Sequence, residues 1–364
     1  MRYRINRRTG DRISEIGFGS AYLFEAGREE AIQALRTAYA GGINYYDLAA
    51  GDGACFPLWG EALSDVRKEV LYQIHFGADY SAGSYGWSLD LDTIKRSVAW
   101  QLKELKTDYI DYGFIHCQDE CSDWETYRKN GVYDYILSLQ AQGIVRHIGL
   151  SSHTPQVILR IMDEVPVDML MFSVNPAYDY GEGEYANGTV DERAAVYRRC
   201  ESEGVGISVM KPFSGGQLLS DAASPFGRAL SVYQCIRYAL DRPGVLTVLP
   251  GCANTEEVRT LLAYETQSED ALDYSVIGSF APPTAAGKCV YCNHCKPCPE
   301  GLDVGLINKL YDLTQAGDAM AKEHYRALEK HAEDCIACGH CDARCPFGVR
   351  QSEKMRRISA YFGF

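Results

Sequence analysis

Residues 105–116, Leu-Lys-Thr-Asp-Tyr-Ile-Asp-Tyr-Gly-Phe-Ile-His, indicate the fold most directly. The second half of this stretch is apolar enough for a buried strand, and it ends on His116. The segment before it has apolar residues at helical spacing, namely Ile94, Val98, Leu102 and Leu105. Asp92 stands where the cap of that helix is expected. A helix followed by a buried strand is the repeating unit of a parallel α/β sheet.

Eight such apolar runs alternate with helical patterns in the first part of the chain. They lie near residues 15–20, 43–47, 70–76, 109–116, 146–150, 169–174, 206–211 and 246–250. Eight strands, each followed by a helix, within about 250 residues are typical of a closed (β/α)8 TIM barrel. An open doubly wound sheet is the alternative, but no Gly-rich dinucleotide-binding motif follows the first strand. We therefore predict an α/β barrel in residues 1–265.

The composition argues against several classes of partner. The chain has 364 residues and a net charge of −13, and a negative surface repels nucleic acid. The N-terminus is polar, and no apolar run approaches the ~18 residues of a membrane helix. We expect a cytoplasmic protein without a nucleic-acid or membrane partner.

Cysteines form two dense runs near the C-terminus. Of 14 cysteines, eight fall in the runs Cys289-Val-Tyr-Cys292-Asn-His-Cys295-Lys-Pro-Cys298-Pro and Cys335-Ile-Ala-Cys338-Gly-His-Cys341-Asp-Ala-Arg-Cys345-Pro. Three thiolates spaced by two residues, then a Cys-Pro, are the pattern of two-cluster ferredoxins, whose fourth cysteine ligates the other cluster. We predict two 4Fe–4S clusters. One would be held by Cys289, Cys292, Cys295 and Cys345, and the other by Cys335, Cys338, Cys341 and Cys298.

Zinc is the alternative for these cysteines. Structural zinc prefers two separated Cys-x2-Cys pairs, and a third cysteine inside each run has no use in such a site. The first run has two residues rather than three before its Cys-Pro, a departure from the ferredoxin pattern. The polar, Pro-containing residues 266–287 are interpreted as a linker, and residues 288–364 as a small α-helical ferredoxin-like domain. Either electron transfer or a structural role is open to the clusters.

Several motifs resemble the aldo/keto reductase family in their order along the chain. They are residues 3–20, 42–47, 105–116, 143–153, Met210-Lys-Pro212 and Leu249-Pro-Gly251. The resemblance extends to a subgroup that carries a two-cluster C-terminal tail. It implies a barrel that reduces carbonyl compounds with NADPH, using an Asp, a Tyr, a Lys and a His at the C-terminal rim.

Two of these four catalytic positions match the family and two do not. Asp47 and His116 stand where the resemblance requires them, but Asp52 replaces the tyrosine and His75 replaces the lysine. An imidazole titrates near ~6.5, and a carboxyl acts as a general acid only if burial raises its pKa. Asp52 is equally well interpreted as a turn residue in Gly51-Asp52-Gly53. The predicted catalytic residues are Asp47, Asp52, His75 and His116.

The nicotinamide site implied by the resemblance is only partly present. Residues that resemble its carboxamide, phosphate and cation contacts are Ser151, Ser152, Lys211, Pro250 and Gly251. Lys211 is equally well explained by a bond to a barrel carboxylate. Three expected groups are replaced, by Met210, Ala253 and Thr260-Leu261. The loss of an arginine at position 253 removes a strong phosphate contact, so NADP(H) is kept as a candidate cofactor only.

Other side chains are expected near the same rim. Cys55, Cys117 and Cys121, with His75, have the atom types for a soft metal, although free cysteines are often simply buried. Aromatic residues in the rim loops suit either stacking on a ring-containing substrate or ordinary packing; they are Tyr22, Tyr80, Tyr85 and Trp87.

These features favour an oxidoreductase that acts on a small organic, carbonyl-containing substrate and relays electrons through two clusters. Exposed clusters suit an anaerobic cytoplasm, with a ferredoxin, a flavoprotein or a nicotinamide as electron donor. Two alternatives stay open. One is a non-redox lyase or isomerase with structural clusters, and the other is a non-catalytic electron carrier.

Overall fold

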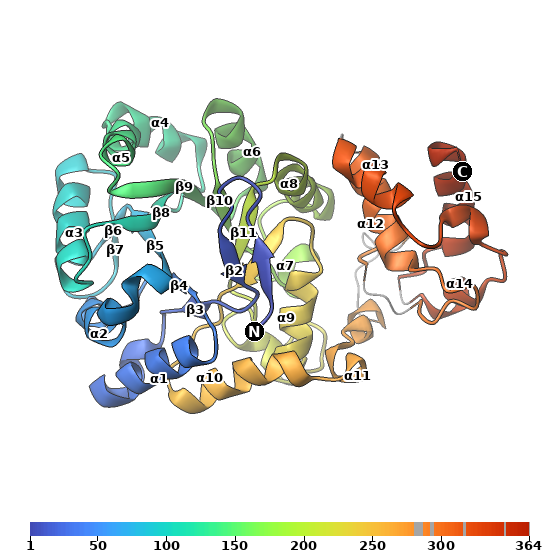
Figure 1. The fold of residues 1–364 in the computed structure, drawn as a ribbon, viewed down its shortest axis with the longest axis horizontal. Helices are drawn as coiled ribbons and strands as arrows, with labels where there is room; N and C mark the ends of the chain where they lie inside the picture. Colours follow the sequence, from blue (N-terminus) through green and yellow to red (C-terminus); the bar gives the residue numbers. More distant parts are fainter. Residues whose placement is uncertain (280–286, 292–294, 316–317, 346, 364) are drawn as a thin grey trace. The chain divides into compact units, whose positions relative to one another are not determined.

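The computed structural model describes residues 1–279, 287–291, 295–315, 318–345 and 347–363 (Figure 1). Residues 280–286 of the predicted linker lie outside the described residues. The chain divides into two compact units. The first comprises Met1–Val174, Val205–Pro212 and Leu246–Gln267, and the second comprises Asn175–Gly204, Phe213–Val245 and Ser268–Phe364. Within the described ranges, every helix is too short or too polar to span a bilayer.

An eight-stranded parallel sheet is the central feature of the fold, with the strand order β12-β11-β10-β9-β8-β5-β4-β3. Its strands are β3 Phe18–Gly19, β4 Tyr45–Asp47, β5 Leu71–Phe76, β8 Ile110–Ile115, β9 Val145–Ser151, β10 Met169–Ser173, β11 Gly206–Met210 and β12 Val245–Val248. Parallel bridges from Ile16 to Val248 and from Gly19 to Gly251 join the first strand to the last. The sheet is therefore a nearly closed barrel, and the α/β prediction with its eight strand positions is confirmed.

Gly19 makes this closure sterically feasible. Its backbone N–H donates to the carbonyl oxygen of Pro250 at 2.9 Å. A Cβ atom on Gly19 would lie 2.8 Å from the carbonyl oxygen of Leu249 and 2.9 Å from that of Pro250. Because these neighbours are backbone atoms, a side chain would force the two strands apart. Glycine at this position is thus a requirement of the closed barrel.

Helices follow the strands of the first unit in sequence. They are α1 Arg28–Ala40, α2 Cys55–Leu63, α3 Leu91–Glu104, α4 Cys121–Lys129, α5 Val132–Ala141, α6 Pro155–Glu164 and α10 Thr255–Leu262. Ile94 and Val98 of α3 are buried, as their spacing predicts. The cap predicted at Asp92 is wrong. Asp90 has the extended backbone that a cap needs, and its carboxylate accepts from the Thr93 N–H at 2.8 Å, whereas Asp92 lies in the first turn.

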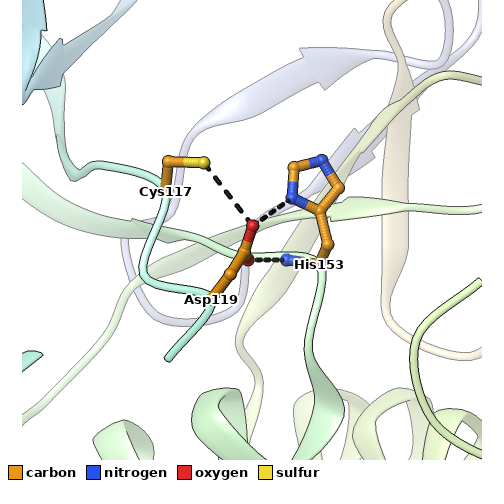
Figure 2. Close-up of side chains that lie close together, drawn as sticks. All are labelled: Cys117, Asp119 and His153. Atoms are coloured by element: carbon orange, nitrogen blue, oxygen red, sulfur yellow. Dashed lines mark hydrogen bonds and ion pairs between the residues drawn. The ribbon is translucent and has the colours of Figure 1, made fainter. Parts of the chain in front are cut away.

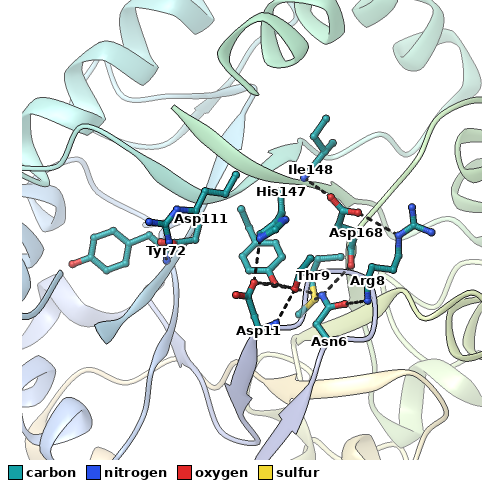
Figure 3. A network of polar contacts seen from close by, with 12 residues as sticks. Asn6, Arg8, Thr9, Asp11, Tyr72, Asp111, His147, Ile148 and Asp168 are labelled. Atoms are coloured by element: carbon teal, nitrogen blue, oxygen red, sulfur yellow. Dashed lines mark hydrogen bonds and ion pairs between the residues drawn. The ribbon is translucent and has the colours of Figure 1, made fainter. Parts of the chain in front are cut away.

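An N-terminal hairpin covers one end of the barrel (Figure 3). It consists of β1 Tyr3–Ile5 and β2 Arg12–Ser14. The Tyr112 hydroxyl of β8 lies 2.5 Å from Asp11 Oδ2 and 3.0 Å from Thr9 Oγ1 in the hairpin loop. Asn6 Nδ2 donates to the carbonyl oxygen of Asp168, which directly precedes β10. Since the hairpin occupies the N-terminal ends of the strands, their C-terminal ends are the place for a site.

The second unit is mostly helical. Its helices are α7 Pro176–Asp179, α8 Val190–Glu203, α9 Val232–Leu240, α11 Glu269–Leu272, α12 Val304–Gln315, α13 Ala319–Arg326, α14 His340–Arg344 and α15 Gln351–Phe362. The buried Asp179 accepts hydrogen bonds from Arg193, Tyr197 and Tyr238. Tyr325 stacks on Phe362 with ring centroids 3.8 Å apart, inside an apolar core shared by the C-terminal helices.

Short elements complete the chain. The strands β6 Ala78–Asp79 and β7 Gly86–Trp87 form a separate antiparallel pair after β5. The 3-10 helices are η1 Leu23–Ala26, η2 Ser64–Glu69, η3 Gln217–Leu219, η4 Ala263–Thr266, η5 Ser275–Ser279 and η7 Ala332–Asp334.

Candidate functional site

Asp47 and His75 form a buried pair at the C-terminal ends of two adjacent strands. Asp47 is the last residue of β4, and His75 is the penultimate residue of β5. They are only 5% and 1% exposed, and His75 Nε2 lies 2.7 Å from Asp47 Oδ1. Because a carboxylate only accepts hydrogen bonds, His75 Nε2 carries a proton, and in the neutral ring His75 Nδ1 is an acceptor.

Gln73 holds the Asp47 carboxylate in place from inside the barrel. Its Nε2 donates to Asp47 Oδ1 at 3.0 Å. Its Oε1 accepts from the Tyr45 hydroxyl at 2.7 Å and from the Ser208 hydroxyl at 3.1 Å. The amide orientation is therefore set by partners on β4 and β11. Asp47 is fixed by a fully buried polar network as well as by its histidine.

His116 directly follows β8 and extends the chain of contacts. Its Nδ1 lies 3.0 Å from His75 Nδ1, and its Nε2 lies 2.7 Å from the Tyr85 hydroxyl. Burial, and next the neighbouring His75, lower the pKa of His116 well below its usual value, which favours a neutral ring. A neutral imidazole has one donor and one acceptor, so when His75 Nδ1 is the acceptor, His116 Nδ1–H donates to it and Nε2 accepts from Tyr85. The four residues form one hydrogen-bonded chain, which we call the Tyr85–Asp47 chain.

Asp52 lies outside this chain. Its Oδ1 accepts from the backbone N–H of Ala54 at 2.7 Å, and its carbonyl oxygen accepts from the backbone N–H of Cys55 at 3.2 Å. These are the contacts of a turn that leads into α2. The structure thus brings together three of the four predicted catalytic residues, Asp47, His75 and His116, and gives Asp52 a local role in its loop.

A second polar group lies after β8 and β9 (Figure 2). His153 Nδ1 lies 2.9 Å from Asp119 Oδ2, and Cys117 Sγ lies 3.7 Å from the same oxygen. Asp119 Oδ1 accepts from the His153 backbone N–H at 2.6 Å. Burial raises the pKa of Asp119, but the hydrogen bonds from His153 outweigh it and the pKa falls below the usual value. The carboxylate is an anion that its hydrogen-bond donors already satisfy.

The same group contains the atom types of a metal site. Its sulfur, carboxylate and imidazole atoms all lie within 4.8 Å of one another. Hydrogen bonds explain the arrangement without an ion, so we assign no metal there. In the part of the chain that the structure describes, the predicted soft-metal set does not converge on one point; its members are Cys55, Cys117, Cys121 and His75.

Ser152 and Lys211 belong to the predicted nicotinamide contacts. The buried Ser152 hydroxyl donates to Asp119 Oδ1 at 3.2 Å and accepts from the Thr154 N–H at 3.1 Å. Ser151, also buried, is the last residue of β9. Lys211 directly follows β11 with φ = 55°, a strained conformation for a residue with a side chain. Burial raises the pKa of the Cys117 thiol to about 12, and the positive charge of Lys211 acts in the opposite direction.

The start of α10 tests whether NADP(H) fits, because Pro250 and Gly251 lead into this helix. The Asn254 side chain caps it through the Glu257 N–H. The Glu257 carboxylate accepts from the Ala253 N–H at 2.8 Å and from Asn254 Nδ2 at 3.2 Å. A protein carboxylate therefore occupies donors that would otherwise bind a phosphate at a helix N-terminus. With Glu256 alongside, this end does not fit the 2′-phosphate of NADP(H).

Three cysteines of the second run and one of the first gather around one pocket. Cys298, Cys335, Cys338 and Cys341 all line it, together with apolar side chains such as Ile336 and Met355. The backbone N–H of Ala337 lies 3.4 Å from Cys335 Sγ, and Ala337 has φ = 55°. These four cysteines are the set that the sequence predicts for one cluster.

Tyr291 in the first cysteine run has a backbone φ similar to that of Ala337 in the second. Tyr291 (φ = 59°) precedes the second cysteine of its run, as Ala337 does in the other run. Val349 N–H lies 3.4 Å from Cys345 Sγ, and Gln351 Nε2 lies 3.7 Å from Cys289 Sγ. One short segment thus contacts two thiols that were predicted to share a cluster. Cys292, the second cysteine of the first run, lies outside the described residues.

Two contacts of the site are missed by sequence reasoning. Gln73 and His75 are two residues apart on β5, so their side chains lie on the same, inner face of the strand. This spacing is a signal that could have identified Gln73. Tyr85 is recognised as a rim residue, but no spacing in the sequence connects it with His116. Its contact depends on the path of the loop after β5.

Comparisons with known proteins agree with this fold. The model of the aldo/keto reductase family matches residues 15–228. The uncharacterized oxidoreductase YqkF of Bacillus subtilis is 25% identical over 272 residues, which is 68% of this chain and 85% of YqkF. The holo form of aldo-keto reductase AKR11C1 from Bacillus halodurans superimposes with a TM-score of 0.62 at 21% identity, over 78% of this chain and 97% of that one. An aldo-keto reductase from Klebsiella pneumoniae in complex with NADPH gives 0.57 at 19% identity, over 78% and 96%.

Proposed function

Because the chain belongs to the aldo/keto reductase family and is an oxidoreductase, we propose that it interconverts a carbonyl and an alcohol on a small organic substrate. We also propose that residues 288–364 form a ferredoxin-like domain with two 4Fe–4S clusters. The observation that carries the first proposal is the Tyr85–Asp47 chain at the C-terminal end of the barrel.

The chemistry of the rim supports carbonyl reduction. A carbonyl oxygen that gains electrons needs a proton, and a positioned acid typically contributes 10²–10⁴-fold to the rate. Barrel enzymes place such groups at the C-terminal face, where β4, β5 and β8 present Asp47, His75 and His116. Their linked rings and carboxylate give a path for a proton in a buried setting.

The spacing of the thiols supports clusters over zinc. Structural zinc uses two separated Cys-x2-Cys pairs, whereas each run here has a third cysteine at the same spacing. Cys298, Cys335, Cys338 and Cys341 line one pocket, which agrees with the ligand set that the sequence predicts for one cluster. When bound, a 4Fe–4S cluster supplies one-electron transfer.

The electron donor follows from the same features. The acidic start of α10 repels the 2′-phosphate of NADP(H), so NADP(H) is not the proposed electron donor. A ferredoxin or a flavoprotein is the proposed donor, and an oxygen-poor cytoplasm is the proposed setting. The net charge of −13 supports a small-molecule substrate over nucleic acid.

A non-redox lyase or isomerase is the second candidate, favoured by one observation. The Tyr85–Asp47 chain consists only of groups that move protons. Turnover of a substrate without any electron donor, at constant cluster oxidation state, would identify this alternative.

The test uses full-length protein that is reconstituted with iron and sulfide without oxygen. Reduced methyl viologen, a one-electron donor, is supplied with a panel of aldehydes and ketones. We expect viologen oxidation that depends on a carbonyl compound and yields the alcohol. His116→Ala should abolish it, while the exposed His324→Ala on α13 should behave as wild type. Full iron content without carbonyl reduction or alcohol oxidation would contradict the proposal.

A further inference from the structure

We propose that Tyr85 is the catalytic acid–base residue of this site, and that His116 and His75 relay its proton toward Asp47. The proposal rests on the proposed carbonyl–alcohol function and names the residue that exchanges a proton with the substrate oxygen.

Exposure distinguishes Tyr85 within the Tyr85–Asp47 chain. Asp47, His75 and His116 are each less than 9% exposed, whereas Tyr85 is 41% exposed. A substrate that enters from solvent therefore meets the chain at Tyr85. Asp52 offers no substitute, because its carboxylate is hydrogen-bonded within its own turn.

The hydrogen bonds have one consistent direction. His75 Nε2–H donates to Asp47, so His75 Nδ1 accepts from His116 Nδ1–H. His116 Nε2 then accepts from the Tyr85 hydroxyl, with a donor–acceptor distance of 2.7 Å. In this arrangement every proton of the chain points toward Asp47, and the lowered pKa of His116 favours a neutral ring there. Tyr85 thus faces a base that is already aligned to receive its proton.

This arrangement allows a balanced proton transfer. When the Tyr85 O–H bond breaks, His116 gains a proton at Nε2 and loses one from Nδ1 to His75. The result is a tyrosinate, a neutral His116 and an imidazolium at His75 beside the Asp47 carboxylate. In alcohol oxidation, the tyrosinate takes the alcohol proton. An electron acceptor, the oxidised form of the proposed one-electron donor, takes two electrons in two steps, and the proton from carbon passes to water.

Carbonyl reduction reverses these steps. The carbonyl takes two electrons from the reduced one-electron donor and one proton from solvent at carbon, and Tyr85 O–H supplies the proton at oxygen. Reduction starts from the state that alcohol oxidation leaves, with Tyr85 protonated and His75 an imidazolium. His75 then returns its proton along the chain to Tyr85, and a proton from solvent restores the imidazolium before the next reduction. Two electrons and two protons are consumed for each alcohol formed.

The loop that carries Tyr85 is anchored at its base. The Tyr85 N–H donates to the carbonyl oxygen of Gly51 at 3.1 Å, and the Gly53 N–H donates to that of Gly83 at 2.7 Å. Asp52 and Ser84 form an antiparallel bridge between these bonds. The Tyr85 ring packs edge-on against His116 with centroids 5.8 Å apart. Two loops therefore hold the hydroxyl in position, as a catalytic acid requires.

Tyr85→Phe tests the proposal, since it removes the hydroxyl and keeps the ring. Tyr39→Phe is the matched control, because it removes a hydroxyl that bonds Glu69 on the surface. The assay is anaerobic carbonyl reduction by the reconstituted full-length protein. We expect Tyr85→Phe to lower kcat by about 100-fold or more with KM changed by less than about 3-fold, and Tyr39→Phe to match wild type. The double variant Tyr85→Phe/His116→Gln should be no slower than the slower single variant, because both act in one relay.

The outcomes distinguish the role of Tyr85 from the carbonyl–alcohol function on which it rests. An active wild type whose kcat survives in Tyr85→Phe would overturn the role of Tyr85 and leave the carbonyl function standing. Multiplicative losses in the double variant would overturn the relay. A wild type without turnover would remove the proposed function and this role together.

Discussion

His75 Nδ1 and His116 Nδ1 lie 3.0 Å apart, so one of these nitrogens carries a hydrogen and the other accepts it. When the His75 ring is neutral, the Asp47 carboxylate at 2.7 Å from His75 Nε2 makes His75 Nδ1 the acceptor. The buried Asp47 thereby influences which ring nitrogen of His116 carries the hydrogen, although it contacts His75 and not His116. The family resemblance implies a lysine, which is a permanent cation, at the position of His75. A histidine ring is charged only when it carries two protons, so the charge at this position depends on protonation.

Asp47→Asn should lower kcat by about 100-fold or more, because the amide no longer fixes the His75 tautomer or stabilises its imidazolium. Iron content should stay at the wild-type level. The measurement is anaerobic turnover with iron analysis. Asp65→Asn, at an exposed ion pair with Arg36, is the control and should retain full activity. Equal rates in both variants would show that Asp47 has no part in the chemistry.

His116 should make the protein less stable in acid. Burial lowers its pKa in the folded state below the ~6.5 of the unfolded chain, so the unfolded state binds the proton more readily. Stability is therefore lost as pH falls below about 6.5, by up to about 1.4 kcal/mol per pH unit from this group.

His116→Asn should flatten that dependence, and His324→Asn should leave it unchanged. The readout is the urea midpoint of anaerobic protein at several pH values between about 7.5 and 5.5, with cluster absorbance monitored throughout. A His116→Asn profile parallel to wild type would refute a buried neutral ring.

Asp111 should be among the most sensitive positions for stability. Its carboxylate, 1% exposed, accepts from Arg67 at 2.7 Å, from the Tyr72 N–H at 2.9 Å and from Arg146 at 2.9 Å. Asp111→Ala leaves Arg67 buried without its charge partner and should cost about 3–5 kcal/mol. Asp65→Ala should cost less than about 1 kcal/mol, as exposed pairs do. Chemical unfolding measures both, and a small loss at Asp111 would contradict the packing described.

Cysteine substitutions should separate the two clusters. Cys298→Ser and Cys335→Ser should impair the same cluster, although the residues belong to different runs. Cys345→Ser should impair the other. Each variant should retain about four of about eight irons after reconstitution, with one of two EPR signals lost. Loss of the same signal in Cys335→Ser and Cys345→Ser would refute the cross-ligation.

The start of α10 should disfavour NADPH. Wild-type protein should bind NADPH no more tightly than NADH, since Glu257 occupies the backbone N–H of Ala253. Ala253→Arg with Glu257→Gln should strengthen NADPH binding by about 10-fold or more, and NADH binding much less. Fluorescence titration of both cofactors decides this, and a wild-type preference for NADPH would contradict the fit argument.

The barrel could be predicted from the sequence because buried parallel strands are apolar on both faces and stand out as runs. Asp47, His75 and His116 could be predicted because they end such runs. The cap at Asp90 was missed because Asp92, two residues along, has the same side chain and only backbone geometry separates them. The contacts of Tyr85 and the pairing of Asp119 with His153 depend on tertiary paths of loops, which local patterns do not encode.

The most direct measurement is reoxidation of chemically reduced, iron-replete protein by a panel of carbonyl compounds under anaerobic conditions. The account predicts that visible absorbance returns when a suitable aldehyde or ketone is added, with one alcohol formed for each two electrons. It also predicts that Tyr85→Phe slows this recovery by about 100-fold or more. Protein that stays reduced with every carbonyl compound, or a Tyr85→Phe variant that recovers at the wild-type rate, would contradict it.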